Sequence, residues 1–250
     1  MKILVTGGSG FIGSNFINHW LNKHPKDSIT NLDLMTYCAN PLTVELHQNK
    51  FGGQYTFIKG DICDQELVNK LVKNTDLIIH FAAESHVDRS IENPNTFIQT
   101  NVIGTNTLLN AALNNGLKRF HHISTAEVFG TLPIHSTKKF TETTSYSPRS
   151  PYSASKAGAD HLVRAYYNTF ELPVTITNCT NNYGPFQFPE KIIPLYILRL
   201  INDKHIPIHG KGKDIRDYLH VEDHCRAIEL VCKKGKLGET YCVGGDTERN

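Results

Sequence analysis

Two short segments of this 250-residue chain carry side chains that could move protons. Tyr152 and Lys156 lie four residues apart at the start of a helical pattern, so their side chains share one face of a helix. An ordinary tyrosine is a poor base at neutral pH, but a neighbouring ammonium favours the phenolate and lowers the tyrosine pKa. Thr125 and Glu127 follow a predicted strand, where a hydroxyl can bind a substrate oxygen and a carboxylate can accept a proton. These four residues are predicted to be catalytic, although a surface helix pair and a solvated loop carboxylate would give the same pattern.

A glycine-rich turn near the N-terminus has the form of a dinucleotide-binding site. Gly7, Gly10 and Gly13 follow a predicted strand and open a predicted helix, which permits close approach of a pyrophosphate to a helix N-terminus. Asp33 comes at the end of the next strand, where a carboxylate accepts hydrogen bonds from ribose hydroxyls. No arginine occurs in residues 34–36 to compensate a 2′-phosphate, so NAD is favoured over NADP. The residues expected to complete the cofactor site are Phe11, Ile12, Asp61, Ile62, Phe81, Ala82 and Ala83.

The elements that would position these residues alternate along the chain. The predicted strands are Lys2–Thr6, Ser28–Asp33, Tyr55–Lys59, Asp76–His80, Arg119–Ser124, Pro173–Thr177, Ile206–His209 and Thr240–Val243. The predicted helices are Gly10–Lys23, Gln65–Lys73, Pro94–Asn115, Ser153–Phe170, Ile192–Ile201 and Val221–Lys233. This order predicts an α/β fold with a Rossmann-type, doubly wound parallel sheet. Residues 1–180 are predicted to form a cofactor-binding domain and residues 181–250 a smaller, incomplete substrate lobe, with some elements interleaved.

The composition is that of an ordinary globular protein, with 39% hydrophobic residues and a net charge of +2. Basic residues are scattered, so no nucleic-acid surface is predicted, and the longest apolar runs are strand-sized, which argues against a membrane partner. Six cysteines without a Cys-x-x-Cys pair indicate reduced thiols in the cytoplasm. No metal site is expected, because the adjacent histidines His121 and His122 would point to opposite faces of a strand.

Four further segments make the chain resemble a known family. They are AAESHVDRS (82–90), NNYGP (181–185), PEKIIP (189–194) and IRD (215–217). With the glycine and tyrosine motifs, they resemble the extended short-chain dehydrogenase/reductase family, and within it the nucleotide-sugar 4,6-dehydratases that act on dTDP-glucose. The resemblance implies a homodimer joined through Pro94–Asn115 and Ser153–Phe170. It implies substrate contacts from Ser85, Thr125, Asn181, Lys191, Ile192, Pro207, His209 and Arg216, and cofactor contacts from Thr100, Tyr152, Lys156 and Asn182.

The same resemblance implies a lyase reaction in three stages. Tyr152 would take the proton of the sugar C4 hydroxyl while a hydride passes from C4 to NAD. Glu127 would then remove the C5 proton as the C6 hydroxyl leaves as water. Return of the hydride to C6, with reprotonation at C5, would give dTDP-4-keto-6-deoxyglucose, as in deoxysugar biosynthesis.

Two features depart from the family pattern. The family has an aspartate between the threonine and the glutamate that protonates the leaving hydroxyl, and this chain has Ala126. Glu127 could pass the C5 proton to the leaving oxygen, the enzyme could stop at C4 as a 4-epimerase or ketoreductase, or Ala126 could be an introduced change. Relatives continue past the position of Asn250, so either the sequence is part of a longer chain, or the substrate lobe is incomplete and the pocket open, with weak substrate binding expected. A protein that binds NAD without turnover is the non-enzymatic alternative.

Overall fold

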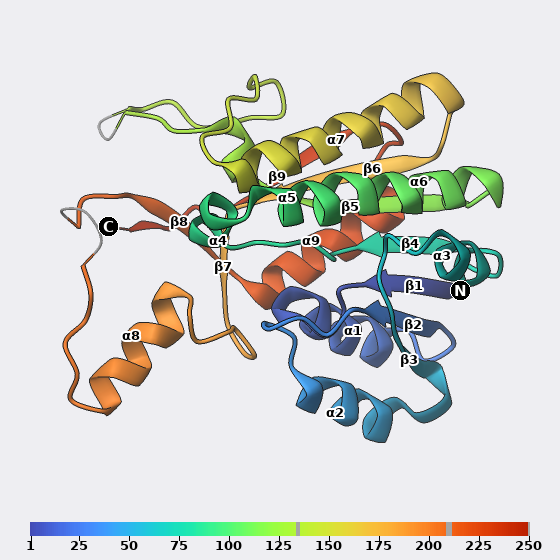
Figure 1. Cartoon of the computed structure of the whole chain (residues 1–250), viewed down its shortest axis with the longest axis horizontal. Coiled ribbons are helices and arrows are strands. Elements are labelled where there is room, and N and C mark those ends of the chain that lie inside the picture. The colour runs from blue at the N-terminus through green and yellow to red at the C-terminus, as the bar shows by residue number, and fades with distance from the viewer. Residues whose placement is uncertain (134–135, 209–211, 250) are drawn as a thin grey trace.

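The computed structural model describes residues 1–133, 136–208 and 212–249. Its largest element is a sheet of seven parallel strands in the order β3-β2-β1-β4-β5-β6-β9 (Figure 1). These strands are β1 (Lys2–Thr6), β2 (Ser28–Asp33), β3 (Tyr55–Lys59), β4 (Leu77–His80), β5 (Arg119–Thr125), β6 (Val174–Cys179) and β9 (Thr240–Val243). The predicted doubly wound parallel sheet is confirmed.

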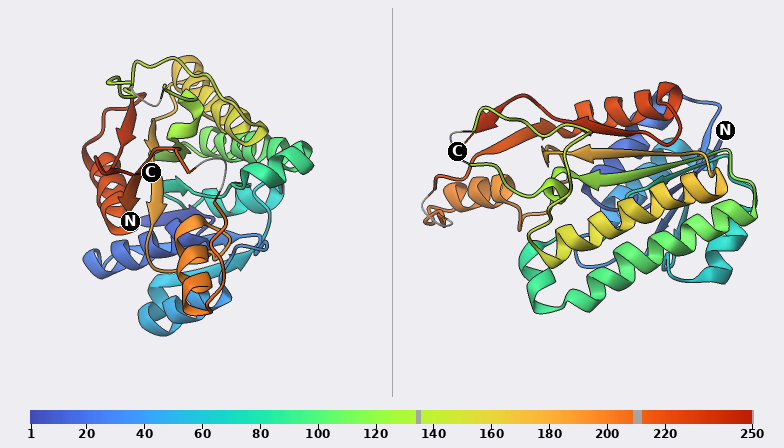
Figure 2. Two further views of the ribbon diagram at one scale, coloured as in Figure 1. Left: turned by 90° about the vertical axis from the view of Figure 1, so that its left-hand side faces the viewer. Right: turned by 90° about the horizontal axis from the view of Figure 1, so that it is seen from above.

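Helices cover both faces of this sheet. They are α1 (Phe11–Lys23), α2 (Pro41–Phe51), α3 (Gln65–Val72), α6 (Thr105–Asn114), α7 (Pro151–Phe170) and α9 (Val221–Lys234). Leu4 of β1 belongs to the core shared with α3, α6 and α7, whereas Ile3 and Val5 belong to the core shared with α1, α2 and α9. This alternation follows from the two-residue period of a strand, and Figure 2 shows the helices on opposite sides of the sheet. Because both faces are covered, the central strands are apolar throughout.

A second, three-stranded sheet lies beyond the carboxyl ends of the large one (Figure 1). It contains β7 (Asn181–Tyr183), β8 (Arg216–His220) and β10 (Glu248–Arg249), with β7 parallel and β10 antiparallel to β8. The helix α8 (Ile192–Ile201) stands apart from the large sheet on the same side. The next elements along the chain return to the first layer, since α9 packs against α1 and β9 pairs with β6.

The long helix predicted from the local pattern before β5 is not one regular α-helix. The helix predicted over Pro94–Asn115 is divided into α5 (Pro94–Phe97), a π-helical segment (Ile98–Gly104) and α6, and it follows the short helix α4 (Val87–Glu92). Two 3₁₀ turns, Gly52–Gln54 and Ala126–Phe129, complete the set.

One helix was missed and one strand was wrongly predicted. The helix α2 has a clear start signal, because the Asn40 side chain accepts a hydrogen bond from Leu42 N and Pro41 is the first helical residue. The predicted strand Ile206–His209 is wrong over residues 206–208, which are irregular, and His209 lies outside the described residues. The carbonyl oxygen of Pro207 instead accepts a hydrogen bond from the Tyr196 hydroxyl.

Within the described ranges, no helix combines the length and apolar character needed to cross a membrane. In the same part of the chain, no three His, Cys, Asp or Glu side chains lie together in an arrangement that could hold a metal ion. All six cysteines are free thiols.

Candidate active site

A cavity of about 730 Å³ opens at the carboxyl ends of the parallel strands, between the large sheet and the segment that carries α8. Ligands of open α/β sheets bind at this edge. It is lined by nearly all the residues predicted for the site, namely Gly7, Gly10, Phe11, Ile12, Gly13, Asp33, Asp61, Ile62, Phe81, Ala82, Ala83, Ser85, Thr100, Thr125, Glu127, Tyr152, Lys156, Asn181, Asn182, Lys191, Ile192 and Arg216.

Two positions of interest do not line the cavity, and a third lies outside the described residues. Pro207 is not among the described residues that line the cavity, although its neighbour Ile208 is. His209, predicted to bind substrate, lies outside the described residues. Ala126 also does not line the cavity, and it packs instead against the small apolar cluster that contains Val128 and Phe129.

The glycine-rich turn packs too closely against neighbouring backbone to carry a side chain at two of its positions. Gly7 has a φ of +71°, and a Cβ there would lie 2.5 Å from the backbone nitrogen of Ala82. A Cβ on Gly13 would collide with the carbonyl oxygen of Gly7. The helix α1 begins after Gly10 without a side-chain cap, so its first N–H groups are free to bind an anion. These observations fit a pyrophosphate.

Asp33 stands at the end of β2 beside this turn. Its Oδ2 accepts a hydrogen bond from Ser9 N at 2.9 Å, and its Oδ1 accepts one from Met35 N at 2.8 Å. Burial raises the pKa of the Asp33 carboxyl, and the two backbone hydrogen bonds oppose that rise. A carboxylate oxygen can accept more than one hydrogen bond, so the site fits a ribose with free hydroxyls and would repel a 2′-phosphate.

The start of α7 places the tyrosine and the lysine at the cavity wall. The Ser150 hydroxyl accepts a hydrogen bond from Ser153 N, and the Ser153 hydroxyl accepts one from Ser150 N, which forms a capping box. Tyr152 is therefore in the first turn, and Lys156 follows one turn later on the same face. The Lys156 Nζ donates a hydrogen bond to the carbonyl oxygen of Ile123 at 2.8 Å.

The protein alone does not lower the pKa of Tyr152 as the sequence predicted. Burial raises that pKa, and the negative charge of Glu127 raises it further, whereas a hydrogen bond with Thr125 lowers it. The pKa of Lys156 is itself lowered by burial, and Asp160 and Cys179 oppose that effect. The expectation neglected the cost of placing a phenolate in a low-dielectric cavity. A further positive charge against the ring is needed to favour the phenolate.

Glu127 lies on the 3₁₀ turn that follows β5. The Thr125 side chain caps this turn by accepting a hydrogen bond from Glu127 N at 3.2 Å. The Glu127 side chain is exposed, but its exposed surface faces the cavity and not the outside of the molecule. The surrounding cavity walls therefore still desolvate its carboxylate. Burial raises the pKa of Glu127, and the charges of Arg216 and Lys191 oppose that rise. A carboxyl with a raised pKa is a stronger base than an ordinary glutamate, which suits it to take up and pass on a proton.

A charged cluster that the sequence did not reveal joins the α8 segment to the cofactor side of the cavity. Glu190 accepts a hydrogen bond from the Tyr37 hydroxyl at 3.1 Å and lies 3.8 Å from the His86 imidazole and 3.6 Å from Arg89. The Arg89 guanidinium stacks 3.7 Å above the centre of the Tyr37 ring. One indication of this cluster was present in the sequence, because the segments that resemble the family contain His86, Arg89 and Glu190. Nothing in the sequence paired them with Tyr37.

Comparison with known proteins agrees with this geometry. A family model described as GDP-mannose 4,6 dehydratase matches residues 4–250. The chain belongs to that family. Among curated members, it is 50% identical to dTDP-glucose 4,6-dehydratase 1 of Escherichia coli K12, over all of this chain and 73% of that protein. It is 45% identical to the dTDP-glucose 4,6-dehydratase of Mycobacterium tuberculosis, again over the whole chain and 74% of that protein.

Solved structures of family members have the same fold. DesIV, a dTDP-glucose 4,6-dehydratase of Streptomyces venezuelae solved with NAD, superposes with a TM-score of 0.94 at 44% identity, over 100% of this chain and 77% of that one. The dTDP-glucose 4,6-dehydratase of Bacillus anthracis, also solved with NAD, gives a TM-score of 0.92 at 45% identity with the same coverage. The resemblance predicted from the motifs is confirmed.

Proposed function

We propose that the protein is a NAD-dependent lyase that converts dTDP-glucose to dTDP-4-keto-6-deoxyglucose. The observation that carries this proposal is the meeting of Tyr152, Lys156 and Glu127 in one cavity with the glycine-rich turn and Asp33. Relatives that share half of its sequence carry that activity in their names.

The cofactor is NAD, and the residues present fit it. The N-terminus of α1 with Gly7, Gly10 and Gly13 would hold the pyrophosphate, and Asp33 would hold a ribose. Thr100 and Asn182 reach the same cavity. When bound, NAD supplies the acceptor and later the donor of the hydride, and its cationic ring adds the positive charge that Tyr152 requires.

The chain's own residues then move protons in a fixed order. Tyr152 takes the proton of the C4 hydroxyl, with Thr125 hydrogen-bonded to the same oxygen. The resulting C4 ketone acidifies the C5 hydrogen, and the Glu127 carboxylate removes it. The C6–O bond breaks, and the leaving oxygen departs as water once it has gained a proton. Because Ala126 carries no acid, we propose that Glu127 delivers that proton itself. C6 then takes the hydride that was removed from C4, and C5 takes a proton, in net terms the one that Tyr152 accepted from the C4 hydroxyl, which restores both side chains.

The nucleotide-sugar end of the cavity is basic. Lys191 and Arg216 both act electrostatically on Glu127, so their charges lie near the chemical centre. We propose that Arg216 pairs with the diphosphate and that Ser85, Asn181, Lys191 and Ile192 complete the substrate contacts, with Pro207 acting from the edge. Residues 181–250 would thus supply most of the substrate lobe, and residues 1–180 the cofactor domain.

A homodimer and a cytoplasmic location belong to the same proposal. The apolar side chains of Ile98, Ile103 and Phe170 are exposed on the helices predicted to meet a second copy. Sedimentation equilibrium of the wild type and an Ile103→Asp variant would test the dimer, which the variant should weaken.

The function is tested by incubating the protein with NAD and dTDP-glucose while NADH absorbance and the 4-keto-6-deoxy product are followed. Tyr152→Phe should abolish NADH formation, because the C4 proton has no acceptor. Glu127→Gln should still form NADH but no product, because oxidation at C4 precedes removal of the C5 proton. Release of a C4 epimer in place of the 4-keto-6-deoxy product would refute the dehydratase and support an epimerase. Bound NAD without any substrate-dependent absorbance change would indicate a protein without turnover.

A further inference from the structure

Asp160 is a fully buried carboxylate on α7, one turn beyond Lys156 and two turns beyond Tyr152. Three neutral groups donate hydrogen bonds to its Oδ2. They are the Ser124 hydroxyl at 2.9 Å, the Tyr146 hydroxyl at 2.7 Å and the Asn178 amide at 3.2 Å. The contact with His122, the charge of Lys156 and the hydrogen bond from Tyr146 keep the pKa of Asp160 below its usual range despite burial. The fold therefore holds a negative charge in its interior behind the catalytic lysine.

Among the groups that face this charge from each packed element, Lys156 is the cation best placed to balance it. On β5, His122 Nε2 lies 3.2 Å from Asp160 Oδ1, but burial and Lys156 lower the pKa of that imidazole to about 4, so it is neutral. On β4, burial keeps His80 neutral, and on β6, burial raises the pKa of the Cys179 thiol to about 11, so it too is neutral. Lys156 lies at i−4 from Asp160, which places both side chains on one face of α7.

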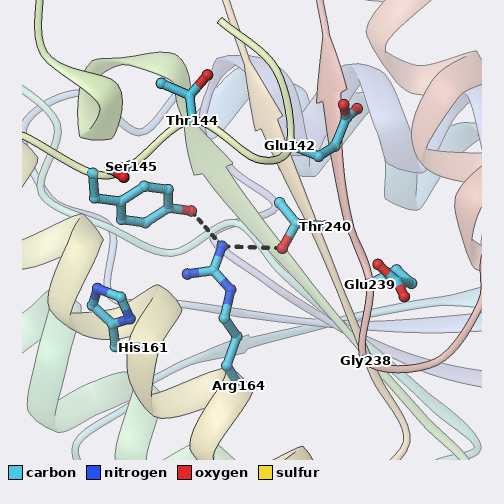
Figure 3. A pocket seen from close by; sticks show the side chains of 9 residues that line it. Glu142, Thr144, Ser145, His161, Arg164, Gly238, Glu239 and Thr240 are labelled. Carbon is cyan, nitrogen blue, oxygen red and sulfur yellow. Dashed lines mark hydrogen bonds between the residues drawn. The ribbon is translucent and has the colours of Figure 1, made fainter.

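Tyr146, which donates to Asp160, is itself held in place at a second cavity of about 340 Å³. There the Arg164 Nη2 donates hydrogen bonds to the Tyr146 hydroxyl at 2.6 Å and to the Thr240 hydroxyl at 3.0 Å. Figure 3 shows Arg164 reaching across this cavity toward Thr240. The guanidinium also lies 4.7 Å from the centre of the Tyr146 ring. Tyr146 is therefore held from outside while its hydroxyl points at Asp160.

We propose that Asp160 is a positioning residue: its buried carboxylate keeps Lys156 an ammonium beneath Tyr152. The inference rests on the proposed function for its catalytic meaning, since it is the ammonium that helps Tyr152 lose its proton. The electrostatic pairing itself does not depend on any substrate. A buried ammonium without a nearby anion would release its proton at lower pH, because burial disfavours the charged form.

The pairing is tested first without substrate. The reactivity of the Lys156 amine toward a small acylating reagent is measured against pH by mass spectrometry in the full chain. In Asp160→Asn, the onset of reactivity should move about 1–2 pH units lower, because an opposite charge within a helical turn shifts a pKa by about that much. Tyr166→Phe, which removes a hydroxyl from the same helix that hydrogen-bonds only Asn106 and Asn110, is the control and should leave the onset unchanged. An unchanged onset in a folded Asp160→Asn variant overturns the proposal.

A double variant keeps the test decisive if Asp160→Asn does not fold. Lys156→Met removes the other charge, so the pair Asp160→Asn/Lys156→Met should recover stability relative to either single change. If Asp160→Asn does not fold, failure of the double variant to fold would overturn the pairing. If both single variants fold, purely additive losses in a urea unfolding cycle would overturn it.

A final arm links the pair to catalysis. With NAD and dTDP-glucose, the alkaline limb of the pH profile for NADH formation should shift to lower pH in Asp160→Asn and stay in place in Tyr166→Phe. If the wild type forms no NADH, the proposed function fails, while the reactivity data still decide the role of Asp160.

Discussion

Two buried histidines should make this fold sensitive to mild acid. His121 in β5 and His224 in α9 are fully buried, and burial lowers the pKa of each imidazole from 6.5 to about 3. The His121 ring lies between the hydroxyls of Thr175 and Thr177, and His224 Nδ1 is 2.9 Å from Asn182 Oδ1. Both rings are therefore neutral in the native protein.

The sign of the effect follows from proton binding. Below pH 6.5 the unfolded chain protonates both rings, whereas the folded chain does not until the pH approaches 3, so the free energy of unfolding falls as the pH drops through this window. At about pH 5, each ring lowers the free energy of unfolding by about 2 kcal/mol relative to neutral pH. This figure depends only on the pKa of histidine in the unfolded chain. Together they cost about 4 kcal/mol, a large share of the roughly 5–15 kcal/mol that stabilises a typical domain.

The assay is urea unfolding followed by circular dichroism at about pH 7.5 and about pH 5. The variant His224→Gln removes one titrating ring and retains a donor for the Asn182 side chain. Between the two pH values, the free energy of unfolding of this variant should fall by about 2 kcal/mol less than that of the wild type. His205→Gln is the control, because the exposed His205 ring is in water in both states. Equal losses in the wild type and His224→Gln would refute the reasoning.

Three other changes have defined outcomes. Ala126→Asp should raise the rate of 4-keto-6-deoxy product formation by about 10²-fold or more, because the longer, charged side chain would leave the apolar cluster in which Ala126 packs and add a general acid to the cavity beside Glu127; an unchanged rate would show that Glu127 suffices. Gly7→Ala should weaken NAD binding at least about 10-fold in calorimetry, since its Cβ meets Ala82, while Gly116→Ala, also at positive φ but in open space, should reduce stability only. Glu229→Gln should lower the unfolding free energy by about 1–3 kcal/mol at neutral pH, because it breaks contacts that join α9 to the end of α1 through two histidines and Lys23, and a further contact with Lys233 within α9. Those contacts lower the pKa of Glu229, so the deficit measured by denaturation should shrink as the pH falls below 4.5.

The sequence by itself determined the features that depend on near neighbours along the chain. The glycine-rich turn requires a strand before it and a helix after it, and both are where the pattern predicted. Tyr152 and Lys156 share a face because a helix repeats every four residues or so, and the carboxyl ends of parallel strands must meet at one edge. These constraints were enough to predict the sheet, the cavity edge and the glycine, aspartate and tyrosine motifs that line it, whereas the predicted residues on its substrate side followed from the resemblance to the family.

Only the tertiary structure decided how those residues are charged. The pKa of Tyr152 rises because the folded chain buries it beside Glu127, an effect that no local spacing encodes. The pKa of Asp160 is lowered because His122 of β5, Lys156 of the same helix and Tyr146 of the preceding loop all act on its carboxylate. Desolvation and electrostatic interaction depend on which distant segments pack around a group, and that packing exists only after the chain has folded.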